Sequence, residues 1–249
     1  MEPISWLIYA AAVFAGSYVQ SVAGFAMGMI VIAVCGAEGS IPVPELAATV
    51  SLISFANIIF AIEGRVALVD RALIGWLTVG QLPAIAIGIW LLTVLDKNAQ
   101  WTLQLLLGIF IASGSLSMII RPVRYTKRSS PAACLAAGIG GGIFGGMFSA
   151  SGPIIAWFAY RQPLEIGVIR ATILTYFAVS TVTRSAIVGV QGGLTEHVMH
   201  LVLVALPIVL VSSWLGKTLP PAIPDATLKR IIFSLLLLMG LTIVLRVVF

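Results

Sequence analysis

The chain has 249 residues, of which 60% are hydrophobic and only 9% are charged. A soluble domain carries about 25% charged residues, so this composition excludes a soluble enzyme, a disordered protein and a nucleic-acid-binding domain. The net charge of +5 therefore reports membrane topology and not a nucleic-acid partner. We predict an all-α polytopic membrane protein within the lipid bilayer. Cys35 and Cys134 lie in apolar runs, which indicates no disulfide scaffold, metal site or cofactor.

The first apolar stretch, residues 3–37, is too long for one membrane helix and too short for two. A crossing helix needs about 20 apolar residues. YVQSVAGFAMG at 18–28 interrupts the stretch, and its glycines indicate a break. Broken backbone at membrane depth is tolerated only where it is buried in protein or lines a cavity. The stretch is therefore either a tilted broken helix or a re-entrant hairpin.

The rest of the chain repeats this layout. A second long stretch, 129–160, carries the interruption GIGGGIFGGMFSASGP at 138–153, and it follows the most polar segment, RPVRYTKRSSP at 121–131. About eight hydrophobic segments result, because the remaining stretches fit one crossing each. These six predicted crossings are at about 45–63, 72–95, 99–120, 166–190, 197–217 and 227–247.

The positions of Lys and Arg favour hairpins. If both long stretches crossed once, the two sides would hold seven and six basic residues outside the spans. If both are hairpins, one side holds eleven and the other holds only Lys97 and Arg246. If each long stretch crossed the membrane twice, the same basic residues would lie on each side. The count of basic residues therefore does not distinguish two crossings from a hairpin. We predict two hairpins and six full crossings, with both termini outside and the basic linker 121–131 cytoplasmic.

The two halves predict an internal duplication. We expect a first membrane repeat at 1–120 and a second at 132–249, joined by the linker. Ser21–Gly24 pairs with Ser149–Gly152, and Thr49 pairs with Thr172. Three crossings per repeat are an odd number, so the second repeat is inverted, as in many secondary transporters. The alternative is that both glycine-rich segments serve helix packing alone.

Two segments carry a family resemblance. GIGGGIFGGMFSASGPIIAWF at 138–158 resembles the second-half motif of the sulfite exporter TauE/SafE family. GSYVQSVAGFAMGMIVIAV at 16–34 is a weaker match, because Gly24-Phe25 stands where a glycine cluster is usual. The resemblance extends over the whole chain in span layout. It implies a transporter of the bacterial inner membrane for sulfite, an organosulfonate or a related anion, coupled to an ion gradient, with export as the expected direction.

The two breaks also suit an anion on physical grounds. A half-helix that starts inside the membrane directs unpaired N–H groups at the break, and small residues let a ligand approach. Pro153 suits the first turn of such a half-helix because it lacks an N–H group. Each residue could equally serve packing. The candidate substrate-binding residues at the breaks and beside them are Gln20, Ser21, Gly24, Gly28, Thr49, Ser149, Ser151, Gly152, Pro153 and Thr172.

Arg184 completes this candidate set. It lies near the middle of the predicted span 166–190, with no acidic residue one helical turn away. A buried guanidinium needs a partner, which could be the substrate, a carbonyl cluster at a break or a water-filled vestibule. The alternative is that the span is shifted and Arg184 snorkels to the outer surface.

The expected mechanism is alternating access, in which a small anion binds between the hairpin tips and one three-span bundle rocks against the other. No carboxylate lies deep in a span, so a coupling proton could travel on a weak acid such as bisulfite. The sequence leaves open whether the protein forms a homodimer. The main alternative is an anion channel or passive pore.

An intramembrane hydrolase is a further alternative, because Ser149-Ala150-Ser151-Gly152 is similar to the Gly-x-Ser-Gly of rhomboid proteases. Such chemistry needs a base within hydrogen-bond reach of the serine. His197 and His200 both lie at a membrane edge, so we do not expect an enzyme.

Overall fold

The computed structural model describes residues 2–64, 66–120, 123–219 and 225–248. These residues form ten α-helices and one short 3-10 helix, and none of them lies in a strand. Eight of the helices are long and apolar enough to cross a membrane. The elements are α1 (Pro3–Ala23), α2 (Met27–Glu38), α3 (Val43–Ile62), η1 (Val66–Leu68), α4 (Arg71–Asn98), α5 (Gln100–Ile119), α6 (Pro131–Phe148), α7 (Gly152–Tyr160), α8 (Ile166–Val190), α9 (Glu196–Thr218) and α10 (Asp225–Val248).

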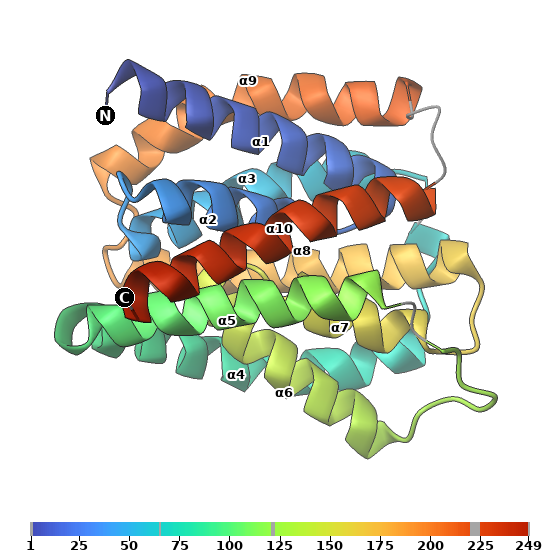
Figure 1. Ribbon diagram of the computed structural model, residues 1–249. Helices are drawn as coiled ribbons and strands as arrows, with labels where there is room; N and C mark the ends of the chain where they lie inside the picture. The colour runs from blue at the N-terminus through green and yellow to red at the C-terminus, as the bar shows by residue number, and fades with distance from the viewer. Residues whose placement is uncertain (1, 65, 121–122, 220–224, 249) are drawn as a thin grey trace.

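The helices form a bundle whose loops gather at two opposite ends (Figure 1). One end holds both chain termini and the loops 39–42 and 191–195. The opposite end holds the loop residues 63–64 and 66–70, the loop 161–165 and the described linker residues 123–130. Helix α2 returns to the end at which α1 begins, and α7 returns to the end at which α6 begins. Each long stretch therefore folds back on itself, which excludes a single tilted broken helix; because α1 and α6 are themselves long enough to cross a membrane, the count of six full crossings stays a prediction.

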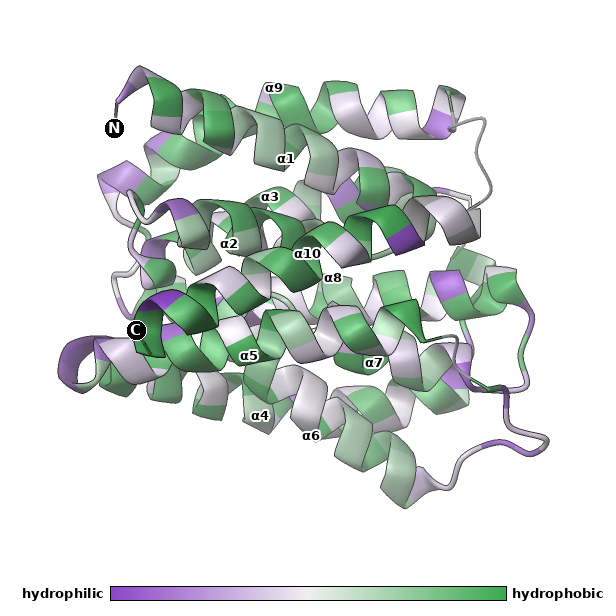
Figure 2. Ribbon diagram, in the orientation of Figure 1, coloured by the Kyte–Doolittle hydropathy of each residue, from purple (hydrophilic) through white to green (hydrophobic). Residues whose placement is uncertain are grey.

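The charged residues sort between these ends as the hairpin topology predicts, and hydrophilic residues gather at both ends in Figure 2. Lys97 and Arg246 lie near the termini, in the last turns of α4 and α10. We call the opposite end, with loop residues 63–64, 66–70 and 161–165 and linker residues 123–130, the basic end. Among the predicted basic residues of that end, Arg65 and Arg121 lie outside the described residues.

Each hairpin turns at a residue in the left-handed backbone region. Gly24 has φ +86° and donates its N–H to the Gln20 carbonyl, while Ser149 has φ +53° and donates to the Gly145 carbonyl. A residue of this kind commonly ends a helix, and glycine adopts the conformation most easily. Gly24 and Ser149 therefore occupy equivalent positions. The predicted pairing of Ser21–Gly24 with Ser149–Gly152 is wrong by three residues.

Other landmarks recur in the two halves at nearly the same spacing. Asp70 caps α4 by accepting from the Leu73 N–H, and Thr195 caps α9 by accepting from the Val198 N–H. Helices α4 and α9 also each contain one internal proline. In Figure 1, α1 and α6 run in opposite directions along the bundle. This is what inverted repeats at 1–120 and 132–249 would produce; the division itself stays a prediction.

Each hairpin packs against a helix of the other half, α6 along α4 and α1 along α9. Glycines make the first of these contacts close. A Cβ atom added at Gly138 would lie 2.3 Å from the Leu77 carbonyl oxygen, and one at Gly146 would lie 2.3 Å from that of Ile85. Small residues allow such approach of membrane helices. These glycines of α6 therefore serve helix packing, which was the alternative to a role in binding. The break that follows α6 is not explained by this packing.

Candidate functional site

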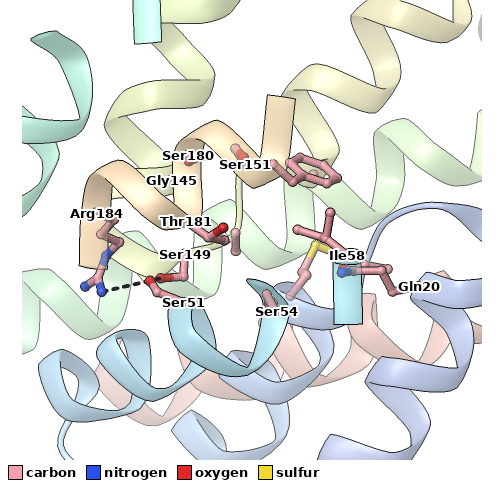
Figure 3. Close-up of a pocket in the computed structure, with 16 residues that line it drawn as sticks. Gln20, Ser51, Ser54, Ile58, Gly145, Ser149, Ser151, Ser180, Thr181 and Arg184 are labelled. Carbon is pink, nitrogen blue, oxygen red and sulfur yellow. Dashed lines mark hydrogen bonds between the residues drawn. The ribbon is translucent and has the colours of Figure 1, made fainter. Parts of the chain in front are cut away.

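A small cavity lies where the two hairpin tips meet, between α3 and α8 (Figure 3). Its volume is about 30 Å³, which is room for about two water molecules. Six predicted site residues line it: Gln20, Gly28, Ser149, Ser151, Gly152 and Arg184. The remaining lining residues are Ala26, Met29, Ser51, Ser54, Ile58, Gly145, Ala150, Phe177, Ser180 and Thr181.

Arg184 extends from α8 into this region and is only 1% exposed, so the alternative that it snorkels to the surface is wrong. Its Nε donates to the Gly146 carbonyl at 2.8 Å, and its Nη1 donates to the Ser51 hydroxyl at 3.1 Å. Nη2 makes no hydrogen bond to the described residues. Neither partner is charged, so no counter-ion among the described residues offsets the positive charge of the guanidinium.

The hydroxyl groups of Ser51 and Ser149 hold the second hairpin tip against α3. Their Oγ atoms are 2.6 Å apart, and Ser149 Oγ donates to the Ala47 carbonyl at 2.6 Å. Ser51 Oγ lies 3.1 Å from the same carbonyl oxygen, so whichever serine donates to Ala47, the other donates to its partner serine, and both protons are used. A chain of hydrogen bonds thus runs from Arg184 through both serines to α3, and the Ser149 hydroxyl has no proton left for a ligand.

Three other serines present hydroxyl groups without a partner. Ser54, Ser151 and Ser180 line the cavity and are 4%, 4% and 5% exposed. Within the described part of the chain their hydroxyls make no hydrogen bond, and none of them is sealed off from the cavity. A buried hydroxyl without a partner is costly, so these three groups are free to donate to a bound molecule.

Gln20 joins the first hairpin tip to the cavity. Its Oε1 accepts from the backbone N–H of Met27, the first residue of α2, at 3.3 Å, and its buried Nε2 has no partner in the described structure. Helices α2 and α7 both begin at the cavity, since Gly28 and Gly152 line it. Helix N-termini carry partial positive charge and free N–H groups. The tips therefore add donors to those of the serines.

The tips approach each other closely at one glycine. A Cβ atom added at Gly28 would lie 2.2 Å from the Ser149 carbonyl oxygen, closer than any real contact. A Cβ atom at Gly152 would lie 3.7 Å from the Phe25 ring, which is an ordinary contact. Glycine is thus required at Gly28 in this arrangement, whereas Gly152 has room for a small side chain.

The charge balance of the cavity favours an anion. Among the described residues its lining includes one cation, Arg184, and no Asp, Glu or His. His197 contacts Glu45 at 2.5 Å in the first turns of α9 and α3, and neither residue lines the cavity. The serines consequently have no base within reach, and this arrangement does not support hydrolysis.

Five predicted site residues lie outside the lining: Ser21, Gly24, Thr49, Pro153 and Thr172. Ser21 accepts from the Asn57 amide at 3.2 Å, between α1 and α3. Thr49 donates to a carbonyl of its own helix, and Thr172 accepts from the Asp70 N–H at 3.0 Å near the basic end. These polar groups serve helix contacts in this structure.

Gly24 and Pro153 lie just beyond the lining. Gly24 forms the turn of the first hairpin, beside the Arg170 side chain. Pro153 is in the first turn of α7, as predicted, but its ring packs against Gly114 of α5 on the side away from the cavity. The structure thus separates the residues that shape the tips from those that face the cavity.

Four polar lining residues were not predicted: Ser51, Ser54, Ser180 and Thr181. A spacing signal was present, because Ser51 and Ser54 are three apart on α3, and Ser180 lies one turn before Arg184 on α8. Residues at such spacings share one helix face. A polar face on each of two apolar spans could therefore have located this part of the site.

Comparison with known proteins decides the family. The chain matches the family model described as "Sulfite exporter TauE/SafE" over residues 8–243. The chain belongs to the TauE/SafE family. This match confirms the resemblance seen in the two glycine-containing segments. As a TauE/SafE member with eight candidate spans, the chain is a multi-pass membrane transporter and not an enzyme.

Two TauE/SafE relatives are similar over most of the chain. The "Probable sulfite/organosulfonate exporter TauE" of Cupriavidus necator is 34% identical over 231 residues, covering 93% of this chain and 90% of the relative. The "Probable inner membrane transporter protein TsaS" of Comamonas testosteroni is 31% identical over 175 residues, covering 68% of this chain and 72% of the relative. No solved structure shows a significant match.

Proposed function

We propose that the chain is a secondary transporter that moves a small sulfur-containing oxyanion, such as sulfite or an organosulfonate, across the bacterial inner membrane. Family membership supports the class, and the name of the Cupriavidus necator relative supports the substrate. The observation that carries the proposal is the cavity between the hairpin tips, whose described lining holds one cation, several hydrogen-bond donors and no acidic residue.

The donors match an oxyanion in charge and in number. Arg184 supplies a buried positive charge with a free Nη2, and Ser151 and Ser180 supply hydroxyl groups from two different elements. Sulfite and sulfonate groups each present three oxygens that only accept hydrogen bonds. Hydrogen bonds to a charged group are worth about 1.5–3 kcal/mol each, enough to offset part of the desolvation of the anion.

The closed cavity is consistent with alternating access. Its volume of about 30 Å³ is too small for a four-atom anion, so the tips must separate for entry and release. Since each hairpin packs on a helix of the other half, we propose that the moving units are α1–α2 with α9 and α6–α7 with α4. This replaces the expected rocking of one intact three-span bundle against the other.

Export is the direction we propose, coupled to the ion gradient through the membrane potential, which is negative inside and expels anions; a proton carried out on the substrate would move against an inward proton gradient. No carboxylate lines the cavity among the described residues, so the protein has no obvious proton carrier there. A weak acid can carry the proton itself: protonation of sulfite to bisulfite lowers its charge and changes how it binds Arg184. An organosulfonate stays ionised and would not carry a proton in this way.

The test is flux of labelled sulfite and of a small organosulfonate in proteoliposomes, with and without an imposed pH gradient. We expect saturable flux with counterflow, a gradient response for sulfite, loss of flux in Arg184→Ala and partial flux in Arg184→Lys. Lys97→Ala, an exposed cation at the end opposite to the basic end, is the control. Non-saturable flux without counterflow would indicate a channel or passive pore. Wild-type flux in Arg184→Ala would remove the cavity from the path.

A further inference from the structure

A second hollow lies on the far side of α7, bounded by α5, α6 and α7. Its volume is about 580 Å³, within the range of pockets that hold small ligands. Helix α7 separates it from the cavity described above: Gly152 lines the cavity, whereas Ile154 and Trp157 line the hollow. We call this hollow the α7 groove.

The α7 groove is apolar. Phe110 and Phe144 stack across it with ring centres 4.5 Å apart. Its two hydroxyl groups are satisfied within α5, because Ser113 donates to the Phe110 carbonyl and Ser117 donates to the Gly114 carbonyl. The serine hydroxyls of the lining therefore do not need a polar partner in the groove. The part of an occupant that lies here must be hydrocarbon.

One edge of the α7 groove carries a cation. Arg161 follows α7 at the basic end, and its guanidinium carbon lies 4.3 Å from the ring centres of both Trp157 and Tyr125. Trp157 lines the groove, so these rings fix the cation at its edge. The Arg161 Nε is buried and has no hydrogen-bond partner among the described residues. The Tyr125 N–H donates to the Arg161 carbonyl at 2.7 Å, which holds the linker in place.

We propose that the α7 groove binds one anionic phospholipid, with an acyl chain along α5 and α7 and the phosphate at Arg161. The hydrocarbon lining and the cation at its edge match the two parts of such a molecule. The basic end faces one leaflet, and basic pockets beside membrane helices are a recurring place for anionic headgroups. This proposal goes beyond the transport proposal and does not depend on which anion is moved.

Such a lipid would support α7 from behind. Pro153 lines the α7 groove and packs against Gly114, and the residue before it lines the cavity. An acyl chain in the groove would therefore limit the movement of the helix whose first turn forms the second hairpin tip. The composition of the membrane would then act on the transport cycle through one bound molecule.

The test is binding of spin-labelled phosphatidylglycerol and spin-labelled phosphatidylcholine to the full chain in nanodiscs. We expect a phosphatidylglycerol preference of about fivefold, the effect of one basic residue near a membrane surface. Arg161→Gln should remove the preference and Arg161→Lys should keep most of it. Lys97→Gln, which removes a cation at the opposite end, should leave it unchanged. Equal preference in wild type and Arg161→Gln would overturn the proposal.

A second pair of variants tests the hydrocarbon part. Ala136→Trp should fill the α7 groove from α6 and displace spin labels of both headgroups, whereas Ala132→Trp, an exposed alanine of α6 outside the lining, should not. Thermal unfolding and a single size-exclusion peak check that every variant is folded. A dimer in phosphatidylcholine nanodiscs that Ala136→Trp dissociates would show that a second copy occupies the groove and would overturn the lipid assignment.

Discussion

The serine hydroxyl groups around the cavity divide into those that bind the protein and those that are free. Ser51 and Ser149 belong to the first group, because their protons and lone pairs are used in the chain from Arg184 to α3. Ser151 and Ser180 belong to the second. Substitution of the first group should therefore disturb the tip, and substitution of the second should weaken anion binding alone.

Ser151→Ala should raise the KM for the transported anion about tenfold with little change in folding, since it removes one donor to a charged ligand. The matched control is Ser115→Ala, because Ser115 is a fully buried serine of α5 without a hydrogen-bond partner and lies outside the cavity lining. Initial rates in proteoliposomes, together with thermal unfolding, give both readouts. An unchanged KM in Ser151→Ala would place its hydroxyl off the substrate path.

Comparison of Gly28→Ala with Gly152→Ala distinguishes a glycine that the close approach of the tips requires from a glycine position that has room for a small side chain. The first adds a Cβ atom 2.2 Å from the Ser149 carbonyl oxygen, so the tips cannot close and flux should fall at least about fivefold, as expected from about 1–3 kcal/mol of overpacking. The second adds an atom at 3.7 Å from its neighbour and should leave flux near wild type. Equal flux in both variants would show that closure of these tips is not part of the cycle.

At the scale of the elements, the hairpins and their partner helices form two units that share few contacts besides the tips. Helix α6 lies along α4 through glycines on both helices, and α1 lies along α9. The tips then meet at α3 and α8, whose polar residues face the cavity. A hairpin that is packed along its length and held at its tip by a few hydrogen bonds suits a site that must open and close.

Substitutions in α6 should follow this division. Gly138→Ala adds an atom 2.3 Å from the Leu77 carbonyl oxygen and should destabilise the protein by about 1–3 kcal/mol, since neither backbone can move far. Gly140→Ala, on another face of the same helix, adds an atom 3.7 Å from Ile154 and should be neutral. Thermal unfolding in detergent compares the two. A matching loss of stability in both would argue against a glycine contact specific to α4.

At the scale of the whole molecule, each hairpin packs against a helix of the other half. We therefore predict that neither half is stable alone. If the chain is divided within the linker 121–131, a tagged first half should be recovered only when the second half is co-expressed, because α1 needs α9 and α4 needs α6. Co-purification from membranes measures this. Accumulation of either half by itself at the level of the intact chain would mean that each repeat forms its own core.

The sequence was sufficient for the helix ends and for the end of the bundle at which each loop lies, because charges are costly in hydrocarbon and therefore mark helix ends. For the same reason, the position of Arg184 in the middle of an apolar span indicated a buried charge that needs partners. The sequence was not sufficient for Ser54 and Ser180, because a hydroxyl group in a helix can bond its own backbone and so reveals nothing about the direction it faces. The predicted pairing of residues between the two repeats was wrong at Ser149. This left-handed position can be taken by residues other than the glycine found at Gly24, so the sequence did not show that the two positions are equivalent.

The buried guanidinium of Arg184 has an electrical consequence. An empty site carries one positive charge, whereas a site that holds a monoanion is close to neutral, so the membrane voltage acts mainly on the empty form. A voltage of 100 mV is worth about 2.3 kcal/mol on a full elementary charge that crosses the whole membrane. An interior that is negative draws the empty, positive site inward, and this is the direction in which an exporter must reset. The residue that attracts the anion would then also let the resting potential drive the unloaded half of the cycle.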